Sequence, residues 1–356
     1  MDSEKKYDNI ILFTNGAIGD FLMGALCADS ARKKLSGGEV IIFTPRNAAI
    51  LQNLFFAYPH VYVLEVSRRN FLQALILLVR LVWQKNIVVN QGVFRKIPHQ
   101  AQLFARLLTI HRESTYLHFI KKGVSLKHKE KGTIVFDYHL SVYENLAHLF
   151  NRENLNIPST VPPYHFVSDA SVLERYDLVH SLYVVVHPCA FSSSRSLPSV
   201  RWAEIFAYLL SNFPSMKVVV TGSNQDNLFI QKIFDAGVSP SSVVNLSGKL
   251  SMMELANVIN GARGYIGVDT GITHLAGVLQ KRSVIIGNLS NPCWLPVYNK
   301  NATILTERKS CTCNGEKGGD CFYLVEGKKY YKCMIDISEE SIHKSIEAML
   351  TLKPHI

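Results

Sequence analysis

The stretch that decides the fold runs Gly264-Tyr-Ile-Gly-Val-Asp269-Thr270-Gly271-Ile-Thr-His274-Leu-Ala-Gly277. Its apolar run from Tyr265 to Val268 predicts a buried strand, and apolar positions at helical spacing follow at once. A strand that turns directly into a helix presents backbone N–H groups and the positive end of the helix dipole to a ligand. The stretch therefore predicts a phosphate-binding turn, with His274 about one turn into the helix. The alternative interpretation is a helix capped by Asp269 or Thr270, followed by a buried histidine.

The composition indicates a globular protein with an acidic partner. The 356 residues are 47% hydrophobic and 19% charged, which is ordinary for a folded chain and favours two domains. The net charge of +10 favours a phosphorylated ligand, an anionic membrane surface or nucleic acid as that partner.

The N-terminus, the longest apolar run and the cysteines predict a cytoplasmic protein. The first residues, Met-Asp-Ser-Glu-Lys-Lys, are polar and do not resemble a signal peptide. The longest apolar run, Phe71 to Trp83, carries Arg80 and is too short to span a bilayer, so its helical spacing predicts a buried helix. Seven cysteines, an odd number, favour a reducing compartment.

Strand and helix patterns alternate along both halves of the chain. The strands expected are 9–15, 39–44, 61–66, 86–91, 182–187, 217–221, 243–246, 265–268 and 283–286. The helices expected are 21–34, 45–58, 70–84, 202–212, 225–235, 251–260 and, at the C-terminus, about 338–352. The Pro- and Ser-rich stretch 157–163 predicts a hinge between domains 1–163 and 164–356. Each domain is therefore expected to be a doubly wound α/β unit that binds ligands at the carboxyl ends of its strands.

The segment from Phe94 to Lys131 is basic. It holds nine Lys/Arg residues against two Glu, together with four histidines and several aromatic residues. Charge runs of this kind are typical of a solvated surface of helices and loops. The functional alternative is a docking face for an anionic acceptor or for membrane headgroups.

A glycine turn follows the first predicted strand. Gly16 and Gly19 allow the backbone to pass close to a ligand, and Asp20 opens the next helix. The turn lacks the third glycine of a dinucleotide fingerprint, and the second strand closes in Thr44-Pro45 without an acidic residue, which argues against a dinucleotide-dependent oxidoreductase. A carboxylate here suits a general base that takes a proton from an acceptor hydroxyl, and the alternative is a helix cap.

Polar loops also end the strands of the second half. The loop from His187 to Trp202 carries hydroxyl groups and two arginines, which suit oxyanion binding, although a surface loop with an Arg-Trp stack is the alternative. The stretch from Gly222 to Asp226 ends the next strand in the same manner. The stretch from Leu246 to Ser251 ends the strand after that, with Ser251 and Glu254 in a capping-box pattern.

Taken in order, these segments resemble glycosyltransferase family 9, the ADP-heptose:lipopolysaccharide heptosyltransferases and their relatives, over nearly the whole chain. The family's Gly-x-x-Gly-Asp motif is matched by Gly16, Gly19 and Asp20, and its His-Pro loop and Arg-Trp pair are matched by His187-Pro188 and Arg201-Trp202. Its Asp-(Ser/Thr)-Gly-x-x-His-Leu-Ala signature is matched by Asp269-Thr270-Gly271, His274, Leu275 and Ala276. Its closing Pro-x-x-Trp-x-Pro-Tyr loop is matched by Pro292, Trp294 and Pro296, with Tyr298 one position late.

The resemblance implies a GT-B fold, two Rossmann-like domains facing a central cleft, with the acceptor on the N-terminal domain and the nucleotide-sugar on the C-terminal one. It implies inverting transfer without a catalytic metal, with Asp20 as the general base. The residues implied for the donor and its diphosphate are Ser193, Ser194, Arg195, Arg201, Asp269, Thr270, Gly271 and His274. Those implied for the nucleotide are His187, Gly222, Asp226, Lys249, Leu250 and Ser251, and those on the acceptor side are Gly16, Gly19, Asn90 and Gln91.

The implied partners are ADP-heptose or another nucleotide-sugar and an anionic glycolipid acceptor, with peripheral contact at the cytoplasmic face of the inner membrane and no nucleic acid. A protein hydroxyl as acceptor, another donor, or a non-catalytic protein that binds a nucleotide-sugar or glycolipid are the alternatives. The non-catalytic alternative rests on one departure, because Val200 stands where the family usually has a lysine before the Arg-Trp pair. We expect Arg195 or Arg201 to supply the missing cation.

Four cysteines cluster near the C-terminus, in a loop over 311–333 that is rich in Gly, Lys and Asp. They are Cys311, Cys313, Cys321 and Cys333. Four thiolates in so short a segment are able to bind a structural zinc or iron ion tetrahedrally. Reduced thiols or a pair of disulfides are the alternative.

Overall fold

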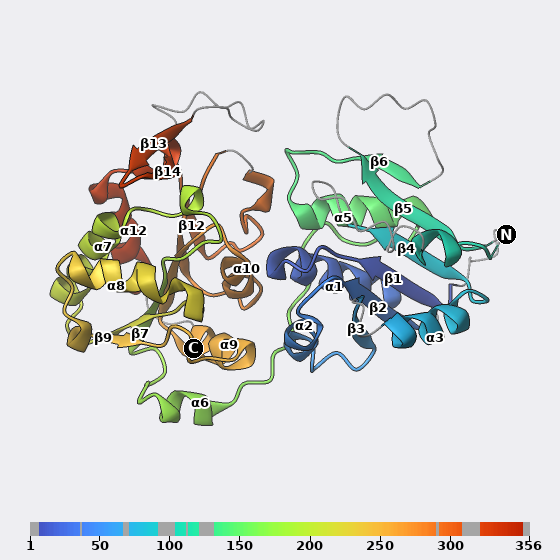
Figure 1. Cartoon of the computed structure of the whole chain (residues 1–356), viewed down its shortest axis with the longest axis horizontal. Helices are drawn as coiled ribbons and strands as arrows, with labels where there is room; N and C mark the ends of the chain where they lie inside the picture. The colour runs from blue at the N-terminus through green and yellow to red at the C-terminus, as the bar shows by residue number, and fades with distance from the viewer. Residues whose placement is uncertain are drawn as a thin grey trace. The chain divides into compact units, whose positions relative to one another are not determined.

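The computed structural model of the chain describes residues 7–35, 38–66, 71–91, 104–111, 113–120, 132–289, 292–307 and 321–351. The chain divides into two compact units, Met1–His165 and Phe166–Ile356, each built on its own sheet (Figure 1). The end of the Pro-rich stretch is held by the first unit. The hydroxyl of Tyr164 donates to the carbonyl of Leu54, and the amide of His165 donates to the hydroxyl of Tyr58 over 2.8 Å.

The first unit contains a six-stranded parallel sheet in the order β3-β2-β1-β4-β5-β6. Its strands are β1 (Asn9–Phe13), β2 (Glu39–Thr44), β3 (Val61–Glu65), β4 (Asn86–Asn90), β5 (Thr115–Ile120) and β6 (Thr133–Val135). Its helices are α1 (Ile18–Arg32), α2 (Ala48–Leu54), α3 (Phe71–Leu81) and α5 (Val142–Phe150). This strand order is that of the doubly wound nucleotide-binding fold.

The second unit repeats the same architecture in the order β12-β11-β10-β7-β8-β9. Its parallel strands are β7 (Tyr183–His187), β8 (Lys217–Val220), β9 (Val243–Asn245), β10 (Gly264–Val268), β11 (Ser283–Ile286) and β12 (Ala302–Leu305). Its helices are α6 (Ala170–Arg175), α7 (Ser199–Asn212), α8 (Asn227–Asp235), α9 (Met252–Gly261), α10 (Gly271–Val278), α11 (Lys332–Ile335) and α12 (Glu339–Thr351). An antiparallel hairpin of β13 (Phe322–Val325) and β14 (Lys328–Tyr331) stands apart from the sheet.

The predicted α/β alternation is confirmed. The differences lie at element ends and in elements that were not predicted, namely helices α5, α6 and α11, strands β5, β6 and β12, and the hairpin strands β13 and β14, which stand within the predicted loop 311–333. Helix α1 begins at Ile18 rather than at Phe21, so Asp20 lies inside its first turn. Strands β5, β6 and β12 were not predicted. They lie at or near sheet edges and are partly exposed, and β5 falls within the basic segment. The apolar pattern of their sequences is therefore weak, and pairing with a neighbouring strand decides their conformation.

The first sheet is covered on both faces, which explains its near-continuous apolar strands. Ile11 and Phe13 of β1 pack in one buried cluster with Leu78 of α3. Leu12 points to the other face, because successive side chains alternate along a strand. There α1 lies directly on it, since a Cβ atom on Gly24 would stand 2.7 Å from a methyl group of Leu12.

Helix α3, for which the spacing predicts a buried helix, is only partly buried. Leu78 and Leu81 are 5% and 1% exposed, but Ile76 and Val79 are 64% and 61% exposed. The helix therefore buries one face only, and the prediction of a buried helix holds for that face alone. Among the helices of the described ranges, none is both long and apolar enough to cross a bilayer.

We predict that Asn86→Ala destabilises the first unit. Asn86 is fully buried, and its amide donates to the carbonyls of Leu81 (2.8 Å) and Gln84 (3.0 Å), which ties the end of α3 to the sheet. The substitution removes these two hydrogen bonds and the one that Asn9 donates to Oδ1 of Asn86 (3.2 Å), so the free energy of unfolding in urea should fall by about 2–3 kcal/mol. Lys85→Ala, which removes only the part-exposed ion pair with Glu113, should cost about 0.5 kcal/mol. Equal losses in the two variants would contradict this role.

Candidate functional site

The topological switch point of the second sheet lies between β7 and β10. These two strands pair in parallel, with Gly267 beside His187. The chain continues from β7 to β8 toward one edge of the sheet and from β10 to β11 toward the other edge. Ligands of doubly wound folds bind at the carboxyl ends of the strands that flank such a point. The loop after His187 and the Asp269-Thr270-Gly271 turn both begin there.

The Asp269-Thr270-Gly271 turn has the strand-to-helix form that its sequence predicts. Thr270 is the N-cap of α10, and its hydroxyl accepts from the amide of Thr273 over 3.4 Å. The cap is therefore confirmed for Thr270. A cap does not satisfy the whole first turn, because the amides of Gly271 and Ile272 have no acceptor within the helix.

Asp269 is buried beside this helix start and has two partners. Its Oδ2 atom accepts from the side-chain amide of Asn288 over 3.1 Å and lies 3.7 Å from a terminal nitrogen of Arg195. Asp269 is 7% exposed. Asn288 was not among the predicted residues, and the only signal for it is its position two residues after β11.

The two arginines of the His187–Trp202 loop have different surroundings. Arg195 ends the short 3-10 helix η2 (Ser193–Arg195) and lies beside Asp269. Arg201 donates to Glu204 of α7 (2.9 Å), to Glu339 of α12 (2.7 Å) and to the carbonyl of Ile337 (3.0 Å). Arg201 thus ties the C-terminal segment to α7, and Arg195 is the cation that stands at the turn.

The hydroxyl groups of η2 are engaged within the unit. The Oγ atoms of Ser192 and Ser194 are 2.8 Å apart, and the hydroxyl of Ser193 donates to the carbonyl of Lys329 in β14 over 3.3 Å. The hairpin of β13 and β14 therefore supports the loop that carries Arg195.

His274 is a buried histidine that contacts the closing loop of the motif series. Its Nδ1 atom lies 3.1 Å from the hydroxyl of Tyr298, and it also has a hydrogen bond with the main chain of Trp294. A Cβ atom on Gly277 would stand 2.9 Å from the same Tyr298 hydroxyl. Burial lowers the pKa of His274, against the opposing effect of Asp269. The ring therefore joins α10 to the 294–298 loop.

The remaining predicted nucleotide residues line neighbouring strand ends. His187 is buried, with its Nδ1 atom 3.0 Å from the hydroxyl of Thr221. Asp226 accepts from the amide and the hydroxyl of Ser223, each at 2.7 Å. Lys249 donates to the carbonyl of Asn245 over 2.8 Å.

The turns at these strand ends depend on close backbone approaches. Gly222 lies against Asp226, because a Cβ atom on Gly222 would stand 3.1 Å from the Cβ atom of Asp226. Leu250 is half-buried. Ser251 is the N-cap of α9, and its capping box with Glu254 is confirmed.

Asp20 of the first unit has a specific hydrogen-bond partner. It is half-buried in the first turn of α1 and accepts from the side-chain amide of Asn15, whose own oxygen accepts from the amide of Ala17 over 2.8 Å. Ala17, not Asp20, is the N-cap residue, so the cap interpretation of Asp20 is wrong. Asn15 was missed by the sequence reasoning, although it directly precedes the glycine turn.

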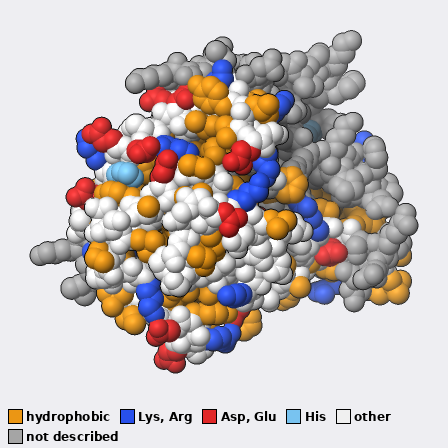
Figure 2. Space-filling model, turned by 60° about the vertical axis from the view of Figure 1, so that its left-hand side comes forward, with side chains coloured by type: hydrophobic (Ala, Val, Ile, Leu, Met, Phe, Trp, Pro, Cys, Tyr) orange, Lys and Arg blue, Asp and Glu red, His pale blue; other side chains and the backbone are white. Residues whose placement is uncertain are grey.

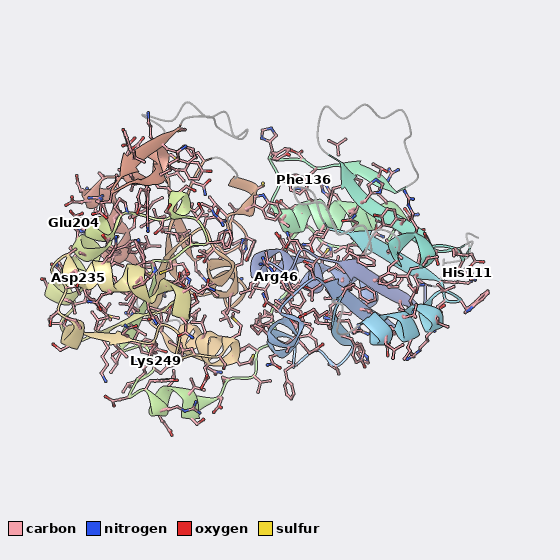
Figure 3. The ribbon with its side chains drawn as sticks, in the orientation of Figure 1. Arg46, His111, Phe136, Glu204, Asp235 and Lys249 are labelled. Atoms are coloured by element: carbon pink, nitrogen blue, oxygen red, sulfur yellow. The ribbon has the colours of Figure 1, made fainter. Side chains whose placement is uncertain are left out.

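The other acceptor-side residues surround this turn. Gly16 has a φ of 77°, and a Cβ atom there would stand 2.9 Å from Cγ of Arg46, an exposed arginine just after β2 (Figure 3). The side-chain amide of Gln91 donates to the carbonyl of Asp20 over 2.5 Å. Asn90 instead donates to the hydroxyl of Tyr116 over 3.1 Å. Gly19 is buried within α1.

The cysteine cluster falls partly outside the described residues. Cys311 and Cys313 lie in the part of the chain that is not described, whereas Cys321 and Cys333 are buried thiols. The Sγ atom of Cys333 accepts from the amide of Leu289 over 3.4 Å. Within the described ranges, no group of three or more His, Cys, Asp or Glu side chains is placed to hold a metal ion.

The chain is similar in sequence to a known protein family. The family model of glycosyltransferase family 9 (heptosyltransferase) matches residues 100–320. Among curated proteins, lipooligosaccharide heptosyltransferase 2 of Haemophilus ducreyi is 21% identical over 166 residues. That alignment covers 45% of this chain and 45% of the relative, so the chain matches less than half the length of that protein.

Solved structures show the same fold over more of the chain. The ADP-heptose lipopolysaccharide heptosyltransferase II of E. coli is 17% identical with a TM-score of 0.70, over 96% of this chain and 98% of that chain. The dodecameric iron-containing heptosyltransferase TibC, in complex with ADP-D-β-D-heptose, is 13% identical with a TM-score of 0.63, over 98% of this chain and 78% of that chain. The fold is therefore the two-unit GT-B fold of these proteins.

We predict that His187 makes the stability of the chain depend on pH. Burial lowers the pKa of His187 to about 4, below the value of about 6.5 in an unfolded chain. The unfolded state then binds a proton that the folded state does not, so stability falls as the pH drops from about 6.5 toward 4. Between about pH 7 and pH 5 the loss is about 2 kcal/mol.

Thermal unfolding of His187→Gln tests this, because the variant should lose less Tm between these two pH values than the wild type does. His60→Gln, at an exposed histidine, should follow the wild type. An unchanged pH dependence in His187→Gln would contradict the assignment.

Proposed function

The chain belongs to glycosyltransferase family 9, and on that premise we propose that it is an inverting glycosyltransferase. The donor is an ADP-sugar carrying a heptose or a similar sugar, and the acceptor is a lipopolysaccharide-core or related glycolipid. The first unit binds the acceptor and the second binds the nucleotide-sugar. A protein hydroxyl as acceptor and a donor with another nucleotide are the alternatives within the family.

The observation that carries the proposal is the placement of Arg195 beside Asp269 at the switch point. A nucleoside diphosphate gains negative charge as it leaves the sugar, and fixed donors aimed at it lower the barrier. The first-turn amides of α10 and its dipole supply such donors. Asp269, held by Asn288, orients the guanidinium of Arg195, which has further N–H groups for the diphosphate.

Arg195 takes the place of the family's missing lysine in this proposal. Val200 is 51% exposed on α7 and carries no charge. Arg201, the other candidate, already donates to two carboxylates and a carbonyl. A planar guanidinium is able to donate two parallel hydrogen bonds to the diphosphate oxygens, where a lysine would act as a point charge.

Asp20 is the proposed general base. As the acceptor hydroxyl oxygen attacks the anomeric carbon, Asp20 takes the hydroxyl proton, and the nucleoside diphosphate leaves with the bonding electron pair. Attack from the side opposite the leaving group inverts the anomeric centre. The amide of Asn15 donates to this carboxylate and so holds its orientation.

An anionic acceptor agrees with the charge of the chain. The net charge is +10, and exposed Arg46 stands beside the turn that leads to Asp20. We place the enzyme in the cytoplasm, in peripheral contact with the inner membrane, where a glycolipid is presented. The four-cysteine segment is a proposed structural zinc or iron site, and the buried thiols of Cys321 and Cys333 fit such a role.

We predict that Arg195, and not Arg201, contributes to donor affinity. ADP-heptose at about 100 times its dissociation constant should stabilise the wild type by about 2.7 kcal/mol in a thermal-shift assay. Arg195→Gln should bind it roughly 10- to 100-fold more weakly, because a charge-assisted hydrogen bond is lost. Arg201→Gln is the matched control and should keep the wild-type affinity.

The same assay with GDP- and UDP-sugars tests the nucleotide. Stabilisation by these compounds alone would overturn the ADP-sugar assignment. Equal loss of affinity in both arginine variants would contradict the role of Arg195.

We predict that Asp20→Asn abolishes transfer while donor binding remains. The amide has nearly the shape of the carboxylate but does not accept the proton, so kcat should fall by about 10²- to 10⁴-fold. Donor affinity, measured by the same thermal shift, should stay at the wild-type value. Wild-type turnover in Asp20→Asn would exclude the general-base role, and a wild type that binds donor without transfer would favour the non-catalytic alternative.

A further inference from the structure

Helix α3 carries a stripe of large apolar side chains on its outer surface. Leu72 is 67% exposed, Leu75 37%, Ile76 64%, Val79 61% and, just past the helix end, Trp83 78%. Single exposed apolar residues are common on soluble proteins, but a contiguous set indicates an interaction surface. These five residues are called the α3 stripe below.

The stripe is a regular face of a helix that is fixed to its unit. At about 100° per residue, its members fall within a sector of roughly 100°. On the other side, Leu78 and Leu81 pack in the core with residues of β1, β2 and β4. The outward side chains are therefore held in place by a well-packed inner face.

The sequence around the stripe is basic and has no acidic residue. Between Glu65 and Glu113 there is no Asp or Glu, while eight Lys or Arg residues occur. Five of the eight lie outside the described residues, and Lys85 is paired with Glu113. Arg80 of α3 and Arg106 are exposed. In contrast, the face of the molecule in Figure 2 mixes Lys/Arg with Asp/Glu side chains. An apolar stripe in a segment with positive and no negative side chains is complementary to a lipid surface, whose headgroups are anionic and whose interior is apolar.

We infer that α3 is an interfacial docking helix for a bilayer surface rich in anionic lipid. The helix lies in the plane of the membrane, the stripe enters the boundary between headgroups and acyl chains, and the exposed Arg80 and Arg106 contact lipid phosphates. Trp83 sits at the interface, where its amphipathic ring is favoured. The role of this surface rests on the proposed function, because a glycolipid acceptor is presented by a membrane.

Charge disfavours a second copy of the chain as the occupant. A symmetric pair through the stripe would bring the exposed Arg80 of each copy to the same interface, and like charges at an interface oppose association. Anionic headgroups instead complement the charge.

Flotation of the full chain with lipid vesicles tests the inference. The wild type should float with phosphatidylcholine vesicles that contain phosphatidylglycerol and bind vesicles of phosphatidylcholine alone far more weakly. Ile76→Glu/Val79→Glu should lower the partition coefficient by at least about tenfold, because charges enter the stripe. Both positions are exposed, so folding should be retained, as an unchanged Tm would show.

The matched control is Phe56→Glu/Leu228→Glu. These residues are 79% and 81% exposed and lie outside α3, so the variant carries the same added charge and should float like the wild type. Equal loss in the control would mean that net charge alone matters and would overturn the inference. So would flotation of Ile76→Glu/Val79→Glu at the wild-type level, or equal binding to both kinds of vesicle. A wild-type dimer in light scattering that the stripe variant dissociates would assign the stripe to a second copy instead.

Donor binding separates this inference from the proposed function. If Ile76→Glu/Val79→Glu loses vesicle binding but keeps its thermal shift with ADP-heptose, both stand. If the wild type floats as expected but no nucleotide-sugar stabilises it, the docking helix stands and the proposed function fails.

Discussion

The parallel pairing of β7 with β10 is the constraint on which the donor site depends. It sets Gly267 beside His187, so the two loops that leave these strands start next to each other although they are far apart in the chain. Only this pairing brings Arg195 to Asp269 and places both over the start of α10. Cys189 and Leu197 of the first loop are buried in the core of the second unit, so the position of this loop follows from the packing on the sheet beneath it.

Contacts with more distant elements then hold these loops. Ser193 donates to β14, Arg201 binds Glu339 at the start of α12, and His274 joins α10 to Tyr298. In each contact, a residue of a predicted motif holds the loop in position and does not face the ligand. A motif therefore mixes side chains that face the ligand with side chains that position the backbone, and spacing alone does not separate the two.

Much of the fold was accessible from periodicity. The buried parallel strands are continuous apolar runs, and β2 and β11 were predicted to the residue. The strands β5 and β12 were not, because partly exposed strands near a sheet edge depend on hydrogen bonds to a neighbour that local sequence does not reveal. At the site, the turn at Asp269, its cap at Thr270 and the capping box at Ser251 were predictable, since these are local interactions. Asn288 was not, because its partner Asp269 is 19 residues away and only the folded sheet brings the two together. Asn15 was missed although its contacts with Ala17 and Asp20 are local.

The sequence by itself therefore determined the alternation of strands and helices, the strand-end turns and the family resemblance, all of which depend on residues close together in the chain. Only the tertiary structure decided that Arg195 rather than Arg201 meets Asp269, that His274 faces Tyr298, and that α3 leaves its apolar stripe uncovered. The physical reason is the same in each case. The periodicity of a sequence indicates which side chains share a face of a helix or strand. Whether that face is covered, and by which residues, depends on contacts between segments far apart in the chain.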